Sequence, residues 1–86
     1  MPRISEFYGI VIAMYYAEHG LPHFHARYAG QEASGAIETL EVLAGSLPDR
    51  ALRLVREWAT LQRADLEADW QRARADQPLE PIPPLA

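Results

Sequence analysis

The chain lacks cysteine and lysine and has no long hydrophobic run, and each absence narrows what it can be. Without cysteine, disulfides cannot stabilise its 86 residues, and no thiolate is there to bind a metal or attack a substrate. The longest apolar run, "YGIVIAMYYA", is shorter than the roughly 20 residues that a helix needs to cross a bilayer. No Arg/Lys-led apolar stretch opens the chain, so we expect no secretory signal, no membrane partner and a cytoplasmic location.

The charged residues are twelve acids and eight arginines, which give a net charge of −4. A protein with this balance has no overall attraction for polyanions, so nucleic-acid binding needs a local basic patch. Six of the eight arginines lie at or after Arg50, and acidic residues alternate with them. This pattern favours a solvated helix surface with ion pairs over a nucleic-acid face, although RNA stays open as a ligand.

The first half of the chain predicts a sheet. Residues 7–16, "FYGIVIAMYY", are β-branched and aromatic and predict one strand with two apolar faces. After the turn residues "HGLP", a second strand over about 23–29 alternates between an apolar and a polar face. Two weaker extended segments follow at roughly 32–38 and 40–45, the first interrupted by small residues.

The second half predicts a single helix over about 48–75. Ser46 and Asp49 have the spacing of a capping box, and Pro48 suits the first turn, where its missing N–H costs nothing. Apolar residues then recur at helical spacing: Leu52, Val55, Ala59, Leu66, Trp70 and Ala73. The expected fold is therefore α+β, with a small, mainly antiparallel sheet of three to four strands packed against one long C-terminal helix.

We expect one domain over residues 1–77, followed by a proline-rich extended tail over 78–86. One helix covers only one face of a sheet, and a strand with two apolar faces is normally covered on both. The second face therefore predicts a covering: a second copy, another protein or the tail folded back. We favour a partner protein or a homodimer.

The stretch "HGLPHFHARY" contains the three histidines of the chain, His19, His23 and His25. On a strand, His23 and His25 share a face with Cα atoms about 6.6 Å apart. Both rings can then converge on a divalent transition metal such as zinc, with His19 across the turn as a third ligand. A carboxylate ligand could come from Glu18 or Glu38.

The same face supports a second interpretation, a metal-independent ribonuclease. His23 and His25 titrate near neutral pH, and Arg27 is a permanent cation one step further along the strand. One imidazole would act as base and the other as acid, and Arg27 would stabilise the charged phosphorane. A third interpretation, in which the histidines are only structural, also stays open at this stage.

Three stretches resemble the bacterial domain-of-unknown-function family DUF4160: "MPRISEFYGIVIAMYY", "EHGLPHFHARY" and the long segment that begins "IETLEVLAGSLPDRALRLVREW". Members usually read Pro-Pro-His-Phe-His, and here Leu21 replaces the first proline. The resemblance implies a small stand-alone protein, often encoded beside a second small protein of unknown function (family 2442). That pairing is read as a toxin–antitoxin module, which implies a toxin-like role for this chain and an antitoxin-like partner.

Overall fold

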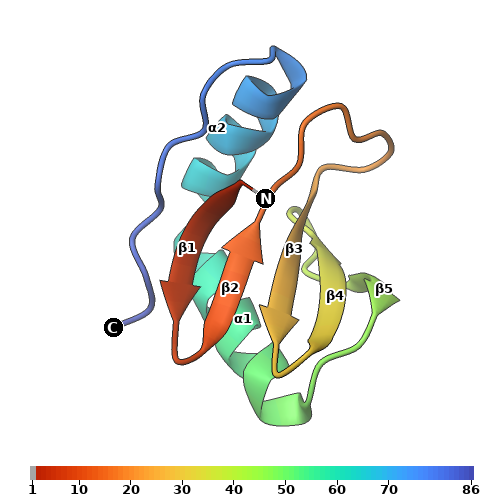
Figure 1. Cartoon of the computed structure of the whole chain (residues 1–86), viewed down its shortest axis with the longest axis vertical. Helices are drawn as coiled ribbons and strands as arrows, with labels where there is room; N and C mark the ends of the chain where they lie inside the picture. Colours follow the sequence, from red (N-terminus) through yellow and green to blue (C-terminus); the bar gives the residue numbers. More distant parts are fainter. Residues whose placement is uncertain (1) are drawn as a thin grey trace.

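The computed structural model describes residues 2–86, which form one five-stranded sheet and two helices (Figure 1). The predicted α+β class, with an antiparallel sheet and C-terminal helical segment, is confirmed, but the predicted three to four strands and single helix are wrong. The elements in chain order are β1 (Arg3–Phe7), β2 (Ile10–Ala13), β3 (His23–Tyr28), β4 (Gln31–Ala36), β5 (Val42–Gly45), α1 (Asp49–Leu61) and α2 (Arg63–Arg74).

The sheet is an antiparallel meander in the order β1-β2-β3-β4-β5. The segment predicted as one strand over 7–16 is a hairpin, because Tyr8 (φ 49°) and Gly9 (φ 78°) form a two-residue turn between β1 and β2. Positive φ at both turn residues matches the twist of an antiparallel pair, and glycine adopts it without strain. The turn places Phe7 directly opposite Ile10.

The hairpin leaves β2 with one apolar face in the core and one face that it shares with polar side chains of β3. Ile10 and Ile12 are fully buried in the core that the sheet shares with the helices. Val11 and Ala13 pair with Arg27 and His25 of β3, so these two residues share the opposite face with polar side chains. A long strand with two apolar faces, our reason for expecting a partner, is therefore absent, and the partner itself stays a prediction.

The helical segment is divided at Gln62, which lies between α1 and α2 and has a non-helical φ of −110°. Neither glycine nor proline marks this division in the sequence. The predicted capping box is also wrong: α1 begins after Pro48 without a side-chain hydrogen bond to its first turn. Neither of the two helices in residues 2–86 is long and apolar enough to cross a membrane.

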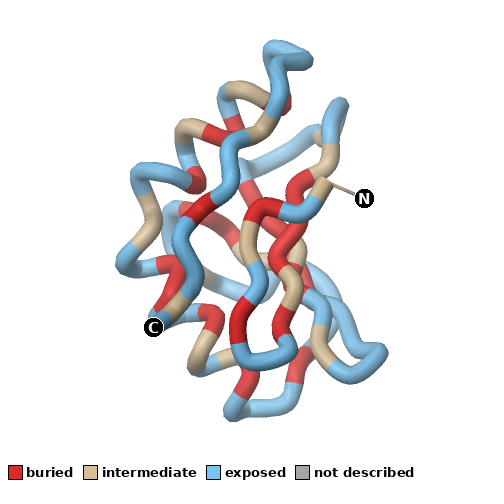
Figure 2. Tube along the Cα trace, turned by 60° about the vertical axis from the view of Figure 1, so that its left-hand side comes forward, coloured by how far each residue is buried: buried red, intermediate tan, exposed pale blue. Residues whose placement is uncertain are grey.

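The core lies between the sheet and the two helices. It includes Phe24 of β3 and the two tryptophans, Trp58 and Trp70, all nearly inaccessible to solvent. Figure 2 shows buried positions within the strands and helices and exposed positions along the turns. Beyond α2, residues 77–86 contain neither helix nor strand and run back beside β1, where Ile82 joins the core (Figure 1).

Candidate metal centre

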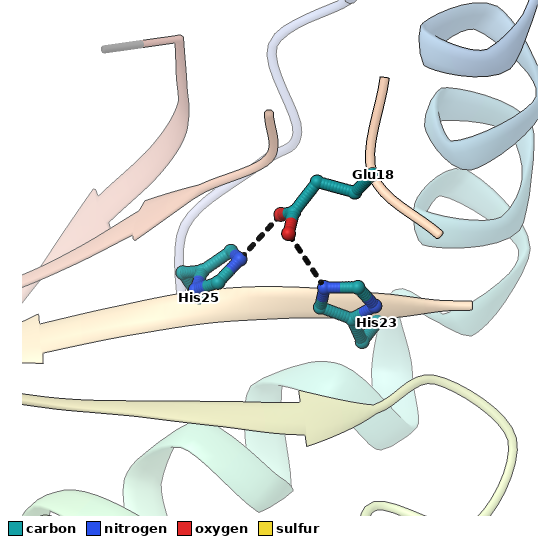
Figure 3. Close-up of side chains that lie close together, drawn as sticks. All are labelled: Glu18, His23 and His25. Carbon is teal, nitrogen blue, oxygen red and sulfur yellow. Dashed lines mark hydrogen bonds and ion pairs between the residues drawn. The ribbon is translucent and has the colours of Figure 1, made fainter. Parts of the chain in front are cut away.

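The carboxylate of Glu18 lies between the rings of His23 and His25 (Figure 3). Glu18 belongs to the loop between β2 and β3, whereas the two histidines lie two residues apart on β3 and share its polar face. Glu18 Oε1 is 2.5 Å from His25 Nε2, and Glu18 Oε2 is 3.3 Å from His23 Nε2. The turn that follows Glu18 thus folds the loop back over the strand.

The other nitrogen of each ring contacts an acceptor outside this cluster. His23 Nδ1 donates to the Leu21 carbonyl oxygen at 2.7 Å, so in the neutral ring the proton is on Nδ1 and the lone pair on Nε2. His25 Nδ1 is 3.5 Å from a carboxylate oxygen of Glu32 on β4. Both imidazoles therefore direct Nε2 toward Glu18 and Nδ1 away from it.

Aromatic rings enclose the two histidines. The Trp70 ring centroid is 5.2 Å from that of His23, and the Tyr15 ring meets His25 edge-on at 4.6 Å. The side chains of His23, His25 and Glu18 are 11%, 17% and 28% exposed, so solvent still reaches the carboxylate. A pocket of about 210 Å³ opens beside His25, lined by Glu32, Ala33, Ser34, Ala44 and Gly45.

The charge state of Glu18 follows from these contacts. Burial raises the pKa of Glu18, but its hydrogen bonds and charge interactions with His25, and then with His23, lower it, and the net pKa lies below the usual value. The carboxyl group is therefore ionised at neutral pH. The atoms of this cluster that could bind a metal ion are two imidazole nitrogens and one carboxylate oxygen. They all lie within 4.8 Å of one another.

This donor set matches the preferences of zinc and of iron(II), which proteins bind through two histidines and one carboxylate. Around a tetrahedral zinc ion at about 2.0–2.2 Å from each ligand, two ligands lie roughly 3.3 Å apart. The distance from Glu18 Oε2 to His23 Nε2 has this value. Glu18 Oε1 and His25 Nε2 are hydrogen-bonded at 2.5 Å and would have to separate to admit an ion.

The residues predicted from sequence divide into two groups. His23 and His25 come together with Glu18, which sequence reasoning named beside Glu38 as an optional ligand. His19 is exposed and is not part of the cluster. Glu38 lines a different pocket, which lies between α2 and the loops that contain Pro22 and Ile37. Arg27 is exposed on the same strand face as the histidines, where its guanidinium pairs with Glu32 at 3.2 Å.

Glu32 is the residue that sequence reasoning missed. The tight turn at Ala29 and Gly30 sets the register of β3 and β4 so that Glu32 lies opposite Arg27. It therefore reaches both Arg27 and Nδ1 of His25. The turn residues "AGQ" were a usable signal, because they fix the register of a hairpin and with it the cross-strand neighbours.

Residues 9–71 match the family model described as "Domain of unknown function (DUF4160)". The chain belongs to this family. The match includes Glu18, His23 and His25, and it stops before the end of α2. Searches of the curated proteins and of the solved structures found no match. The resemblance to DUF4160 seen in the sequence is thus confirmed.

Proposed function

We propose that this DUF4160 protein binds a divalent transition metal ion through Glu18, His23 and His25. One observation carries the proposal: both Nε2 atoms point toward the same carboxylate while both Nδ1 atoms contact acceptors outside. Metal-bound histidines usually have such an arrangement, in which an outer carbonyl or carboxylate holds Nδ1–H and leaves Nε2 for the metal. Leu21 and Glu32 supply these outer contacts.

The geometry around His23 requires a positive charge, a proton or a metal ion, between His23 Nε2 and Glu18. With the proton of the neutral ring on Nδ1, the Nε2 lone pair faces a carboxylate oxygen at 3.3 Å, which is also an acceptor. Two facing acceptors repel each other unless a proton or a cation lies between them. A metal ion would accept both lone pairs and, once it displaces the Nε2 proton that His25 donates to Glu18, the lone pair of His25 Nε2 as well.

Three protein ligands leave a coordination position for water or for a substrate, as in catalytic zinc sites. The pocket beside His25 adjoins the cluster and has space for a small group. A metal in this place would lower the pKa of a bound water and make a hydroxide nucleophile available at neutral pH. Metal-assisted hydrolysis is therefore the reaction class that best fits the cluster.

Metal binding to purified, chelator-treated protein tests the proposal. We expect isothermal titration with Zn²⁺, Co²⁺ and Mn²⁺ to show a single site for at least one of them. Glu18→Gln, His23→Ala and His25→Ala should each weaken that site by about 100-fold or more, because each removes one of three ligands. His19→Ala is the matched control and should bind normally. Absence of a site, or equal loss in His19→Ala, would contradict the proposal.

A second candidate function is the metal-independent ribonuclease. The contact between Glu18 and His25 favours it, because a carboxylate that accepts an imidazole N–H fixes the orientation of the ring for proton transfer. His25 would take the proton of a 2′-hydroxyl as its oxygen attacks phosphorus, His23 would protonate the departing 5′ oxygen, and Arg27 would stabilise the phosphorane. Cleavage of RNA in excess EDTA that is lost in both His25→Ala and Arg27→Ala would support it. RNA left intact by folded wild-type protein would contradict it.

We also propose the cellular role that the family resemblance implies, a toxin-like cytoplasmic protein with an antitoxin-like partner. The metal centre offers a direct test of this role. Expression of the wild-type chain should arrest bacterial growth, and a folded His25→Ala variant should not. Arrest that survives Glu18→Gln, His23→Ala and His25→Ala would separate the role from this site.

A further inference from the structure

A pocket of about 460 Å³ lies between α2 and the loops at the ends of β3 and β4. Its wall on α2 consists of residues at positions i, i+3, i+4 and i+7, which share one face of the helix: Ala64, Glu67, Ala68 and Gln71. The other wall consists of Pro22, directly before β3, and of Ile37 and Glu38, directly after β4. Small-molecule sites have volumes of about 300–1,000 Å³, so the pocket is large enough for a ligand.

The pocket is lined by two acidic residues and by no basic one. Glu38 and Glu67 contribute one carboxylate from each wall, and both residues are exposed. Neither forms an ion pair within residues 2–86. Arg63, at the start of α2, instead donates through Nε to the Ile37 carbonyl oxygen at 3.1 Å. The two carboxylates are therefore available to a cation from outside the chain.

Most of the remaining lining is apolar, with short side chains that leave space. Trp70 completes the wall and is only 3% exposed, since the His23 ring packs against it at a centroid distance of 5.2 Å. An indole attracts a cation that reaches its ring. A guanidinium is planar, less strongly hydrated than an ammonium, and able to donate parallel N–H groups to a carboxylate. A guanidinium is therefore the cation that best fits carboxylates beside an indole and apolar walls.

We propose that this pocket binds a guanidinium group at the end of an aliphatic chain. Glu38 and Glu67 accept its N–H groups, and the alanine and proline side chains contact its methylene groups. The guanidinium comes either from a small guanidine or from an arginine residue of another protein. The proposal goes beyond the metal centre, because Glu38 and Glu67 are not among the proposed metal ligands.

Two guanidines of different origin test the proposal on the metal-free wild-type chain. Agmatine represents a small guanidine, and N-acetyl-arginine amide represents an arginine residue in a protein. We expect at least one of them to shift the indole N–H resonance of Trp70 in a saturable way, and the one that binds more tightly identifies the source. The indole N–H resonance of Trp58, which is buried in the core, should not shift.

The matched ligand controls are N-carbamoylputrescine and N-acetyl-citrulline amide, in which a neutral urea replaces the guanidinium. Each should bind at least about tenfold more weakly than its guanidine, because it lacks the charge that the carboxylates bind. Binding of neither guanidine, or equal binding of a guanidine and its urea counterpart, would overturn the proposal.

Variants of the pocket separate its charge from its shape. Glu38→Gln and Glu67→Gln should each weaken binding at least about threefold, and the double variant at least about tenfold, since both side chains keep their size and lose their charge. Ala68→Leu keeps both charges but fills the pocket and should weaken binding at least about tenfold. Unchanged affinity in the double variant or in folded Ala68→Leu would overturn the site.

Glu57→Gln is the matched control, because Glu57 is an exposed acid on α1 outside the pocket. It should bind the guanidine as wild type does. A loss in Glu57→Gln equal to that in Glu67→Gln would show attraction by net charge alone and would also overturn the site. All these variants should bind zinc as wild type does, so failure of this proposal and failure of the metal centre are distinguishable.

Discussion

The two faces of β3 differ in what their side chains contribute. Phe24 and Ala26 point into the core and are almost completely buried, whereas His23, His25 and Arg27 point to the opposite face and surround carboxylates. The apolar face gains stability by removing surface from water. The polar face gathers imidazoles and a carboxylate whose contacts outweigh the desolvation of Glu18, but such charge pairs on a partly exposed surface add little to the stability of the fold. The first face therefore stabilises the fold, and the second is available for binding.

Shortening Phe24 gives the largest expected effect and measures the apolar face. Phe24 packs against Trp58, with ring centroids 6.1 Å apart, and against Gly35 across the strand pair. Phe24→Ala should lower the free energy of unfolding by about 3–5 kcal/mol, because it leaves a cavity in the core. Urea denaturation measures the loss. His25→Ala, the matched change on the other face, should cost far less in metal-free protein, and an equal cost would remove the distinction between the faces.

Metal-dependent stability is the next largest effect and belongs to the polar face. An ion bound only by the folded state at a free concentration 100 times its Kd should raise the free energy of unfolding by about 2.7 kcal/mol. Thermal denaturation with and without Zn²⁺ measures this rise. Glu18→Gln should abolish it, whereas Phe24→Ala should retain it at temperatures where that variant is folded. A rise that persists in Glu18→Gln would locate the metal elsewhere.

Acid titration of the metal-free protein should give a smaller effect, at most about 1 kcal/mol. The pKa of Glu18 is lower in the folded protein than its ordinary value of 4.5, since contacts with His25 and His23 outweigh burial. The stabilisation is therefore complete above the ordinary pKa and is lost as the pH falls through the lowered pKa. The stability difference between wild type and Glu18→Gln should decrease over that acidic range. A difference that grows on acidification would contradict the lowered pKa.

Arg27→Ala gives the smallest expected effect, below about 0.5 kcal/mol in unfolding free energy, because its pair with Glu32 is largely exposed to solvent. Its metal affinity should stay within about threefold of wild type, since Arg27 is not a ligand. Urea denaturation and zinc titration test both expectations. A loss of metal binding as large as that of His25→Ala would show that the two residues act as one unit.

The alternation of β3 is the part of the fold that sequence predicted best. A period of two between Phe24, Ala26 and Tyr28 and the intervening polar residues needs no information from elsewhere in the chain. The hairpin at Tyr8 and Gly9 was missed because aromatic and β-branched residues continue across it, although Gly9 was available as a turn signal. The division at Gln62 has no such signal, since the residues there are ordinary helix formers.

The candidate site was predictable only in part. The shared face of His23 and His25 follows from local strand geometry. The choice of Glu18 over Glu38, and the position of Glu32, depend on how a loop and a second strand fold over β3. Residues close in sequence, such as His19, were favoured as ligands because spacing is visible and loop direction is not. The residue types of the site are therefore visible in the sequence, whereas the turn geometry that decides which of them meet is not.

Nitrogen-15 NMR of the imidazole side chains during zinc titration is the most direct test of the central claim, that His23 and His25 present Nε2 to one metal ion. We predict that one equivalent of Zn²⁺ shifts the Nε2 signals of both histidines, that both rings carry the proton on Nδ1 in the zinc complex, and that His19 is unaffected. Rings that do not respond to zinc, or that bind it through Nδ1, would contradict the account.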